Sequence, residues 1–462
     1  MDSQVTRREV LKKGLIGAAG LTVLPMIIAA CSPAEATPSA TEVPTPVPAG
    51  PTPAPATPTP VKLTGTLTIG SNHSALNEQT GMSFVNDAFK KATGLTVTMN
   101  TVDQDTFYDQ ISSYLGGTPA DALTWLSGYR MQYFAAKGLI TAIDDVWAKV
   151  SKDYTAGFAN AVTGADKKIY GIPTAYYPWC VFYRKSVWSD KGYTVPATWD
   201  DLIALCKKMQ TDGLTPIAFA DKQGFPAMGT FDILNLRLNG YQFHVDLLSG
   251  KEKWTDARVT AVFNQWAKLI PFYTHGFSGL NWEDATDTLV RKQSGMYLIG
   301  LFVTDEVLNV DKAAVDDLDF FTFPFMGNDF DAEKALDAPL DIWMISAKSP
   351  SLAANLANAK AYLEFWAKAS TQQIFFIAQP GKLPTSSEAD PSSYTALQKK
   401  AVQIVSTAQK ITHFLDRDTR PEFVGTNGMP SFLLSFLKNP SQNLTQLQAS
   451  IQAFWDKLPV ES

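Results

Sequence analysis

Short apolar runs typical of buried strands alternate with amphipathic helical patterns in the part of the chain that follows residue 65. Strand and helix patterns follow one another at 67–69, 84–89, 96–99, 107–115 and 122–125. Because single helices separate the strands, we expect a parallel sheet with right-handed crossovers. Ligands bind beyond the carboxyl ends of such strands, so residues 71–73 and 125–129 are candidates for a site.

A second α/β stretch follows, and the last part of the chain is helical. Strand patterns lie at 169–173, 181–183, 217–220, 296–299, 318–323 and 342–345, and helical patterns lie at 199–209, 258–273, 282–292 and from 352 onward. Thr198 or Asp200 is expected to cap the first of these helices, because both side chains accept hydrogen bonds from free helix N–H groups. The chain is therefore predicted to be an α/β protein.

The first residues have the pattern of an export signal. Arg7-Arg8 precede an apolar run at 14–30, and two alanines lead to Cys31, as in a bacterial lipobox. The paired arginines resemble a twin-arginine signal, although Val10 stands where that signal usually has phenylalanine. The alternative is an uncleaved anchor, since about seventeen apolar residues is near the lower limit for spanning a bilayer. We expect cleavage after residues 1–30, lipid on Cys31, and a protein tethered to the outer face of the cell membrane.

Residues 31–62 are predicted to be the lipidated cysteine and a tether. Apart from Cys31 the stretch is almost entirely Pro, Thr, Ala, Ser and Val, and it has no apolar face to bury. Such a composition is typical of an extended, semi-rigid spacer. The folded part is expected to begin near Leu63. About four hundred residues are too many for one ordinary core, so we expect two lobes.

Composition narrows the classes of function. The net charge of -6 argues against nucleic-acid binding, and 45% hydrophobic residues are ample for two cores. The four histidines lie far apart and show no metal-ligand spacing, at His73, His244, His275 and His413. We therefore expect no metal and no cofactor.

Two cysteines remain once Cys31 carries lipid. Cys180 and Cys206 could form one disulfide in an oxidising compartment, or they could be small buried hydrophobic residues. We favour buried thiols, because their spacing suggests no disulfide framework. A protein exported already folded by the twin-arginine route would bury such thiols in the cytoplasm.

The order of several motifs resembles a known family. These are 133–140 with Asp144-Asp145, the Lys-Ile-Tyr-Gly-Ile-Pro run at 168–173, Tyr183-Arg184-Lys185 with 196–202, the helical pattern at 353–369, and Gly381-Lys382-Leu383-Pro384. Together they resemble the extracellular solute-binding proteins of ATP-binding-cassette (ABC) importers, in the carbohydrate-binding group related to maltose-binding protein. The resemblance covers nearly all of the chain after residue 67.

The resemblance implies a two-lobed, type II periplasmic-binding-protein-like fold with the ligand in a cleft between lobes joined by hinge crossings. It places the first lobe at 65–173 plus 325–372 and the second at 174–324 plus 373–462. It also implies a monomer that binds a solute, closes around it by a hinge motion and docks on the transmembrane permease subunits of an ABC transporter. No catalysis is implied.

A sugar offers an apolar C–H face and a rim of hydroxyl groups, so its site needs flat aromatic rings beside hydrogen-bonding side chains. We expect ligand contacts from aromatic residues at Trp125, Tyr129, Tyr176, Tyr177, Trp179, Phe302 and Trp343, and from polar residues at Asn72, His73, Glu78, Ser127, Asp341, Asp416 and Arg417. Phe302 stands where relatives often have a tryptophan. Asp341 and Trp343 replace a usual glycine run and are expected to reach the cleft with their side chains. For Asp121 a solvated surface position or a capping role is expected instead.

Other functions stay open on the sequence alone. Arg417 lies near aromatic residues and could pair a carboxylate, so an acidic sugar or another anionic solute is an alternative ligand. A surface-tethered glycoside-active enzyme would need two carboxylates about 5 to 9.5 Å apart. Acid pairs occur at Asp144-Asp145, Asp200-Asp201 and Asp316-Asp317, but neighbouring carboxylates on a helix point apart. A structural or adhesive lipoprotein would expose its aromatic residues as a patch, which two lobes with a cleft argue against.

Overall fold

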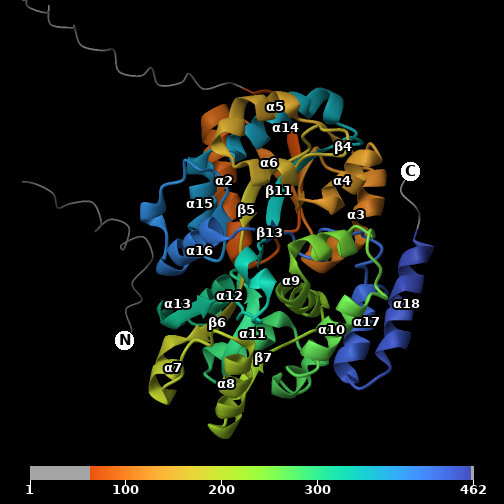
Figure 1. The fold of residues 1–462 in the computed structure, drawn as a ribbon. Coiled ribbons are helices and arrows are strands. Elements are labelled where there is room, and N and C mark those ends of the chain that lie inside the picture. The colour runs from red at the N-terminus through yellow and green to blue at the C-terminus, as the bar shows by residue number, and fades with distance from the viewer. Residues whose placement is uncertain (1–62, 459–462) are drawn as a thin grey trace, which may run out of the picture. The chain divides into compact units, whose positions relative to one another are not determined.

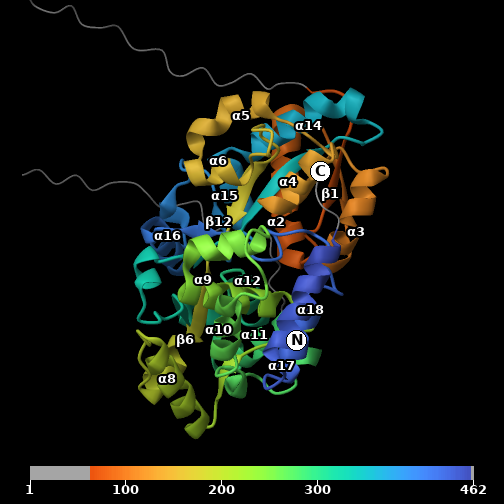
Figure 2. The ribbon, with the colours of Figure 1, turned by 45° about the vertical axis from the view of Figure 1, so that its right-hand side comes forward.

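The computed structural model describes residues 63–458, in which two β-sheets carry helices on their faces (Figure 1). The export signal, the lipid site at Cys31 and the tether lie outside the described residues. Between residues 63 and 458, no helix is both long enough and apolar enough to cross a bilayer. The helices α5 and α14 lie in the upper part of both views and α8 and α11 in the lower part (Figures 1 and 2).

The first sheet has strand order β12-β5-β11-β3-β1-β2, with β4 paired to β11. Its strands are β1 (Leu67–Ser71), β2 (Val97–Thr101), β3 (Ala122–Leu126), β4 (Ile140–Thr141), β5 (Ile172–Tyr176), β11 (Leu340–Ser346) and β12 (Leu383–Pro384). As expected, β1 is parallel to β2 and β3. The sheet as a whole is mixed, because β11 runs antiparallel to both β3 and β5.

The helices that accompany the first sheet are α2 (Leu76–Thr93), α3 (Gln104–Gly116), α4 (Tyr129–Ala136), α5 (Asp144–Val150), α6 (Ala156–Ala161), α14 (Leu352–Trp366) and α15 (Ala369–Phe376). Of these, α2, α3, α14 and α15 cover predicted helical patterns, whereas α4, α5 and α6 were not predicted. Helix α2 ends at Gly94, whose φ of 80° is the left-handed conformation that glycine adopts without strain. Helix α3 begins after Asp103, whose side chain accepts a hydrogen bond from the Thr106 N–H.

The second sheet has order β7-β8-β6-β9. Its strands are β6 (Trp179–Arg184), β7 (Thr215–Ala218), β8 (Ser294–Gly300) and β9 (Leu318–Phe321), and a small separate sheet pairs β10 (Leu336–Asp337) with β13 (Ile411–Thr412). The remaining α-helices are α7 (Lys185–Lys191), α8 (Trp199–Thr211), α9 (Phe225–Leu248), α10 (Ala257–Trp266), α11 (Trp282–Val290), α12 (Val303–Val310), α13 (Lys312–Asp317), α16 (Ala396–Thr407), α17 (Met429–Lys438) and α18 (Leu444–Lys457). Short 3₁₀ helices are η1 (Ser151–Asp153), η2 (Ile270–Phe272), η3 (Phe277–Gly279), η4 (Asp329–Glu333) and η5 (Pro391–Ser393).

Helix α9 is the largest element that the sequence patterns did not predict. Most of its residues are buried, so it has no continuous polar face and no amphipathic period. It also contains Gly240 at a φ of 79°, which interrupts the helical backbone. A Cβ atom on Gly240 would stand 2.3 Å from the Phe330 ring, so both the conformation and the space require glycine there.

The chain crosses between the two sheets more than once. Strand β5 of the first sheet extends to Tyr176, and β6 of the second begins at Trp179. The chain returns to the first sheet after β9 and contributes β11 and then β12. The sequence placed residue 383 in the second lobe, whereas β12 pairs with β5 in the first sheet. Cys180 and Cys206 are free, buried thiols, and burial raises the pKa of each to about 12.

Asp121 joins the first sheet to helix α14. Its carboxylate accepts hydrogen bonds from the Thr68 backbone and hydroxyl at 3.0 Å, from Ser349 and Ser351 at 2.7 Å, and from Asn355 at 3.0 Å. Burial would raise the pKa of this carboxyl, but the hydrogen bonds outweigh burial and lower it. Asp121 is thus not the solvated residue or helix cap that the sequence suggested, but a buried acceptor that joins β1 to the start of α14.

Asp121→Asn is expected to lower the free energy of unfolding by about 2–3 kcal/mol, because buried hydrogen bonds to a carboxylate are lost or reversed. The depressed pKa means that the contribution is present above the unfolded pKa of about 3.9 and is lost as pH falls through the lower folded value. Urea unfolding at pH 7 measures the loss. The control is Asp87→Asn on the exposed face of α2, which should leave stability unchanged; equal losses in both variants would contradict this role.

Candidate functional site

A cavity of about 940 Å³ is lined by residues from both sheets and from the segment 414–431. Its size lies within the range of small-molecule sites. The ends of β1 and β3 contribute Asn72, His73 and Trp125, as expected for parallel strands that present their carboxyl ends to a ligand. From the second sheet, Trp179 begins β6 and Phe302 follows β8. The cavity therefore lies where the two sheets face each other.

Most of the predicted contact residues line this cavity. They are Asn72, His73, Glu78, Trp125, Tyr177, Trp179, Phe302, Asp341, Asp416 and Arg417. Ser127, Tyr129, Tyr176 and Trp343 do not belong to the lining.

Packing against helix α14 explains why Trp343 does not reach the cavity. The Trp343 ring packs on Tyr362 and Trp366 of that helix, at 5.3 and 5.4 Å between ring centroids, and the residue is buried. Asp341 and Ile342, nearer the start of β11, do line the cavity. The side chain expected in the cleft therefore belongs to the core between the first sheet and α14.

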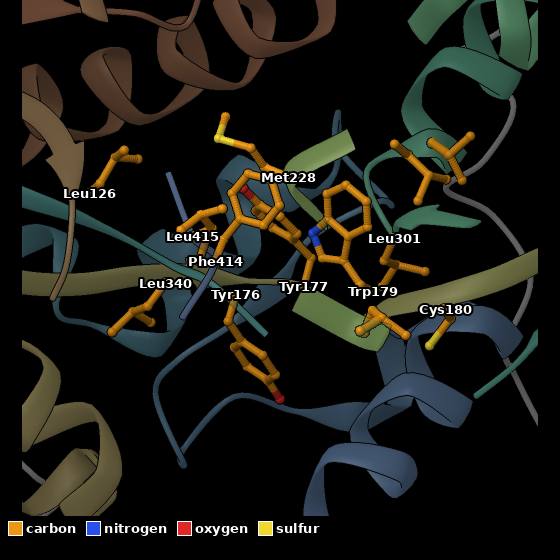
Figure 3. Close-up of a cluster of buried hydrophobic side chains, with 14 of the residues drawn as sticks. Leu126, Tyr176, Tyr177, Trp179, Cys180, Met228, Leu301, Leu340, Phe414 and Leu415 are labelled. Carbon is orange, nitrogen blue, oxygen red and sulfur yellow. The ribbon is translucent and has the colours of Figure 1, made fainter. Parts of the chain in front are cut away.

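The other three excluded residues have local structural roles. The Tyr176 ring packs on Phe158 at 5.3 Å and points away from Tyr177 and Trp179 (Figure 3). Ser127 is fully buried, and its hydroxyl lies 3.5 Å from a ring nitrogen of His413. Tyr129 begins helix α4 outside the cavity.

Three predicted rings line the cavity but are almost completely covered. Trp125 and Trp179 are each 2% exposed and Tyr177 is 6% exposed. Trp179 stacks on Phe414 with centroids 5.0 Å apart and planes 17° apart (Figure 3). A Cβ atom on Gly229 would stand 2.4 Å from the Trp179 ring, so α9 also packs closely against it. These rings shape the wall and leave little free face for stacking.

Half-buried rings form a different surface in the same cavity. They are Tyr108, Phe225, Trp282 and Phe302, of which only Phe302 was predicted. Trp282 meets Phe302 edge to face at 5.2 Å. Trp282 begins α11 directly after the Asn281 capping box, a signal visible in the sequence that marks a helix start and not a cavity.

Arg417 is buried and already paired. Its Nη1 donates to Asp341 Oδ1 at 2.7 Å, and its Nη2 donates to the Tyr177 hydroxyl. The guanidinium is therefore neutralised within the protein. The sequence left open that Arg417 pairs a carboxylate of the ligand, but in the structure Asp341 already occupies that role.

Lys382 connects two carboxylates and was not predicted as a site residue. Its Nζ lies 3.2 Å from Glu78 Oε1 and 3.7 Å from Asp341 Oδ2. Burial would raise the pKa of Glu78, but Lys382 and His73 outweigh burial and hold it at about 2. The family motif that contains Lys382 was visible in the sequence, but its pairing with Glu78 was not.

Carboxyl groups outnumber cations along the lining. The acidic residues are Glu78, Asp103, Asp109, Asp221, Glu283, Asp305, Glu306, Asp341, Asp416 and Glu422, and the cations are Arg130, Lys222, Lys382 and Arg417. This balance disfavours an anionic ligand. Within the described part of the chain, none of the three adjacent acid pairs considered for an enzyme lines the cavity, and no group of three or more His, Cys, Asp or Glu side chains could hold a metal ion.

Comparison with known proteins gives concordant matches. The family model described as bacterial extracellular solute-binding protein matches residues 74–373. The solved structure of the bacterial solute receptor AcbH, which has an exclusive substrate preference for β-D-galactopyranose, is 38% identical with a TM-score of 0.80, covering 85% of this chain and 98% of that one. The α/β periplasmic-binding-protein-like fold expected from the sequence is confirmed by this likeness.

Two curated relatives are more distant. An uncharacterized ABC transporter extracellular-binding protein of Pyrococcus horikoshii is 22% identical over 301 residues, which is 64% of this chain and 65% of that protein. The alpha-glucosides-binding periplasmic protein AglE of Rhizobium meliloti is 24% identical over 405 residues, covering 80% of this chain and 82% of that protein. The match to the archaeal relative thus spans slightly less than two thirds of its length.

Lys382→Met is expected to destabilise the protein by about 3–5 kcal/mol at pH 7, because Glu78 and Asp341 lose a buried cation. The depressed pKa of Glu78 means that its pairing stabilises the fold above the unfolded pKa of about 4.3 and is lost as pH falls through about 2. The difference in free energy of unfolding between wild type and Lys382→Met should therefore be smaller at pH 3 than at pH 7. Urea unfolding at the two pH values measures it.

The matched control for this variant is Lys360→Met. Lys360 pairs with the largely exposed Asp145 at 2.8 Å, and such pairs contribute less than about 1 kcal/mol. If Lys382→Met lost the same free energy of unfolding at every pH, or if both variants lost equal amounts, the buried pairing would not stabilise the site.

Proposed function

The chain belongs to the bacterial extracellular solute-binding protein family, and on that basis we propose that it captures a small carbohydrate and delivers it to an ABC importer. Proteins of this family act by binding and not by catalysis. One observation carries the carbohydrate assignment: half-buried rings at Phe225, Trp282 and Phe302 share one cavity with hydrogen-bonding side chains at Arg130 and Asp416. Rings suit the C–H face of a sugar, and the polar groups suit its hydroxyls.

The ligand we propose is a neutral sugar, either a monosaccharide or a short oligosaccharide. AcbH prefers β-D-galactopyranose and AglE binds α-glucosides, so galactose and α-linked disaccharides are the first candidates. The excess of carboxyl groups along the cavity supports a neutral ligand over an acidic sugar.

Capture would work by closure of two lobes, each built on one of the two large sheets. We propose that β12 belongs with the first lobe, which modifies the boundaries 65–173 plus 325–372 and 174–324 plus 373–462 by a few residues. Asp305 of α12 accepts a hydrogen bond from the Gly381 N–H at 2.8 Å. This bond joins the helix that follows β8 of the second sheet to the segment that leads into β12 of the first sheet. A ligand that touches both lobes favours the closed form, because only that form makes both sets of contacts.

The working place we propose is the outer face of the cell membrane, in agreement with an extracellular or periplasmic family. Lipid on Cys31 would anchor the protein, and the proline-rich tether at 32–61 would let it reach the permease. We propose that the protein works as a monomer.

Titration calorimetry of wild type at pH 7 tests the ligand class. The panel is D-galactose, D-glucose, melibiose, maltose, raffinose and D-galacturonate, with glutamate as a non-sugar. At least one neutral sugar is expected to bind and to raise the melting temperature, since it binds only the native state. Trp282→Ala should weaken that binding at least about 10-fold, because it removes one of the half-buried rings that line the cavity.

The control variant is Phe84→Ala, which removes an aromatic ring exposed on α2 outside the cavity and should leave affinity unchanged. Binding of glutamate and of none of the sugars would overturn the carbohydrate assignment. Sugar binding unaffected by Trp282→Ala would show that the ligand lies elsewhere.

Cys31→Ser is expected to release the protein from the membrane of a bacterial host and to abolish its labelling with radioactive palmitate, because the thiol carries the lipid. Membrane fractionation followed by immunoblotting measures the distribution. Wild type should remain with the membrane fraction. A serine variant that stays membrane-bound would favour the uncleaved anchor instead.

A further inference from the structure

Arg130 is a buried cation that lines the cavity, and it has no ionic partner in the described part of the chain. Arg130 belongs to helix α4 and is 6% exposed. Its Nε and Nη1 have no hydrogen-bond partner among residues 63–458. Unpaired buried donors are rare in native proteins, because each costs free energy that a partner would recover. An unpaired guanidinium beside a cavity therefore points to a ligand group.

Aromatic rings hold Arg130 in place. The guanidinium carbon lies 5.5 Å from the centre of the Tyr108 ring and 5.6 Å from that of Trp125. Both rings also line the cavity. Stacking of this kind orients a planar guanidinium without using its hydrogen-bond donors. The side chain is thus positioned in advance, and a ligand need not bear the cost of ordering it.

An acceptor shares the cavity with these donors. Asp416 lines the same cavity, and its Oδ1 has no hydrogen-bond partner within the described residues. Its nearest cation is Arg417, with 3.7 Å between Oδ1 and Nε. Burial lowers the pKa of Arg130, and the Asp416 carboxylate is the main influence that raises it again. The two groups are close enough to interact electrostatically, yet they form no salt bridge within residues 63–458.

We propose that Arg130 and Asp416 together recognise one hydroxyl group of the sugar, which accepts a hydrogen bond from the guanidinium and donates one to the carboxylate. The inference rests on the proposed function and specifies how the same cavity selects its ligand. A hydroxyl group is the ordinary sugar substituent that both accepts and donates. A carboxylate in this position would satisfy Arg130 but would face Asp416, so the pair selects for a neutral hydroxyl and against a uronic acid.

The experiment compares wild type, Arg130→Met and Arg130→Lys by titration calorimetry with D-galactose and its 2-, 3-, 4- and 6-deoxy forms. If another neutral sugar of the panel binds wild type in place of galactose, the deoxy forms of that sugar are used. Arg130→Met should weaken sugar binding about 10- to 100-fold, since a hydrogen bond to a charged group is lost. The sugar affinity of Arg130→Lys should lie between those of wild type and Arg130→Met, because lysine keeps the charge but lacks the planar guanidinium group.

One deoxy form should identify the hydroxyl that is recognised. Wild type should bind that form about 10- to 100-fold more weakly than the parent sugar, whereas Arg130→Met should bind the two almost equally. The matched control is Lys91→Met, which removes an exposed cation from α2 outside the cavity lining and should change affinity less than about 2-fold. Thermal unfolding of each variant establishes that it is folded, and Arg130→Lys provides the comparison if Arg130→Met is not.

Unchanged affinity in folded Arg130 variants would overturn the inference while leaving the proposed function intact. Tighter binding of D-galacturonate than of D-galactose would also overturn the inference. The same holds if Arg130→Met loses as much affinity for the deoxy sugar, relative to the parent sugar, as wild type does. If wild type binds no sugar of the panel, the proposed function fails and the inference fails with it.

Discussion

The buried guanidinium of Arg417 is the interaction on which the cavity depends. A charge removed from water must be compensated by well-placed partners, and the partners here come from different parts of the chain. Asp341 belongs to β11 and Tyr177 lies at the crossing between the sheets, while the Leu340 carbonyl also accepts from Nη1, at 3.4 Å. Separation of these segments would leave the cation unpaired in the interior. The pairing therefore holds the loop of Arg417, strand β11 and the crossing at Tyr177 together on one side of the cavity.

The loop that carries Arg417 also completes helix α4. Gly128 has no side chain with which to cap that helix, so the first N–H groups need other acceptors. The Tyr129 N–H donates to Asp418 Oδ1 at 3.3 Å, and the Arg130 N–H donates to the Arg417 carbonyl at 3.1 Å. Farther along, the Thr419 hydroxyl donates to the Leu248 carbonyl at the end of α9. One loop thus binds elements of both halves and positions Arg130 and Asp416 toward the same space.

The charges of the cavity fall into two groups. Arg417 and Lys382 are compensated by Asp341 and Glu78, so they maintain the architecture whether or not a ligand is bound. Arg130 is held by stacking, and its Nε and Nη1 have no hydrogen-bond partner within residues 63–458. A receptor that must release its ligand to a transporter benefits from this division, because ligand exchange then alters few of the interactions that hold the fold together.

Local patterns predicted much of the fold. The parallel strands β1 to β3 and the helices α2 and α3 between them follow from hydrophobic periodicity. Helix α9 escaped prediction because a helix buried on nearly all sides has no polar face to mark its period.

By itself the sequence determined the α/β class, the family and most of the segments that border the cavity, since strand ends and motifs are local features. The tertiary structure decided which side chains face the cavity. Helix α14 packs on Trp343 and holds its ring in the core, and Lys382 meets Glu78 across 304 positions of sequence. Ring exposure likewise depends on neighbours from distant segments, which cover Trp179 and leave Trp282 half-buried. Contacts between residues far apart in the chain have no local signature, so only the folded chain determines them.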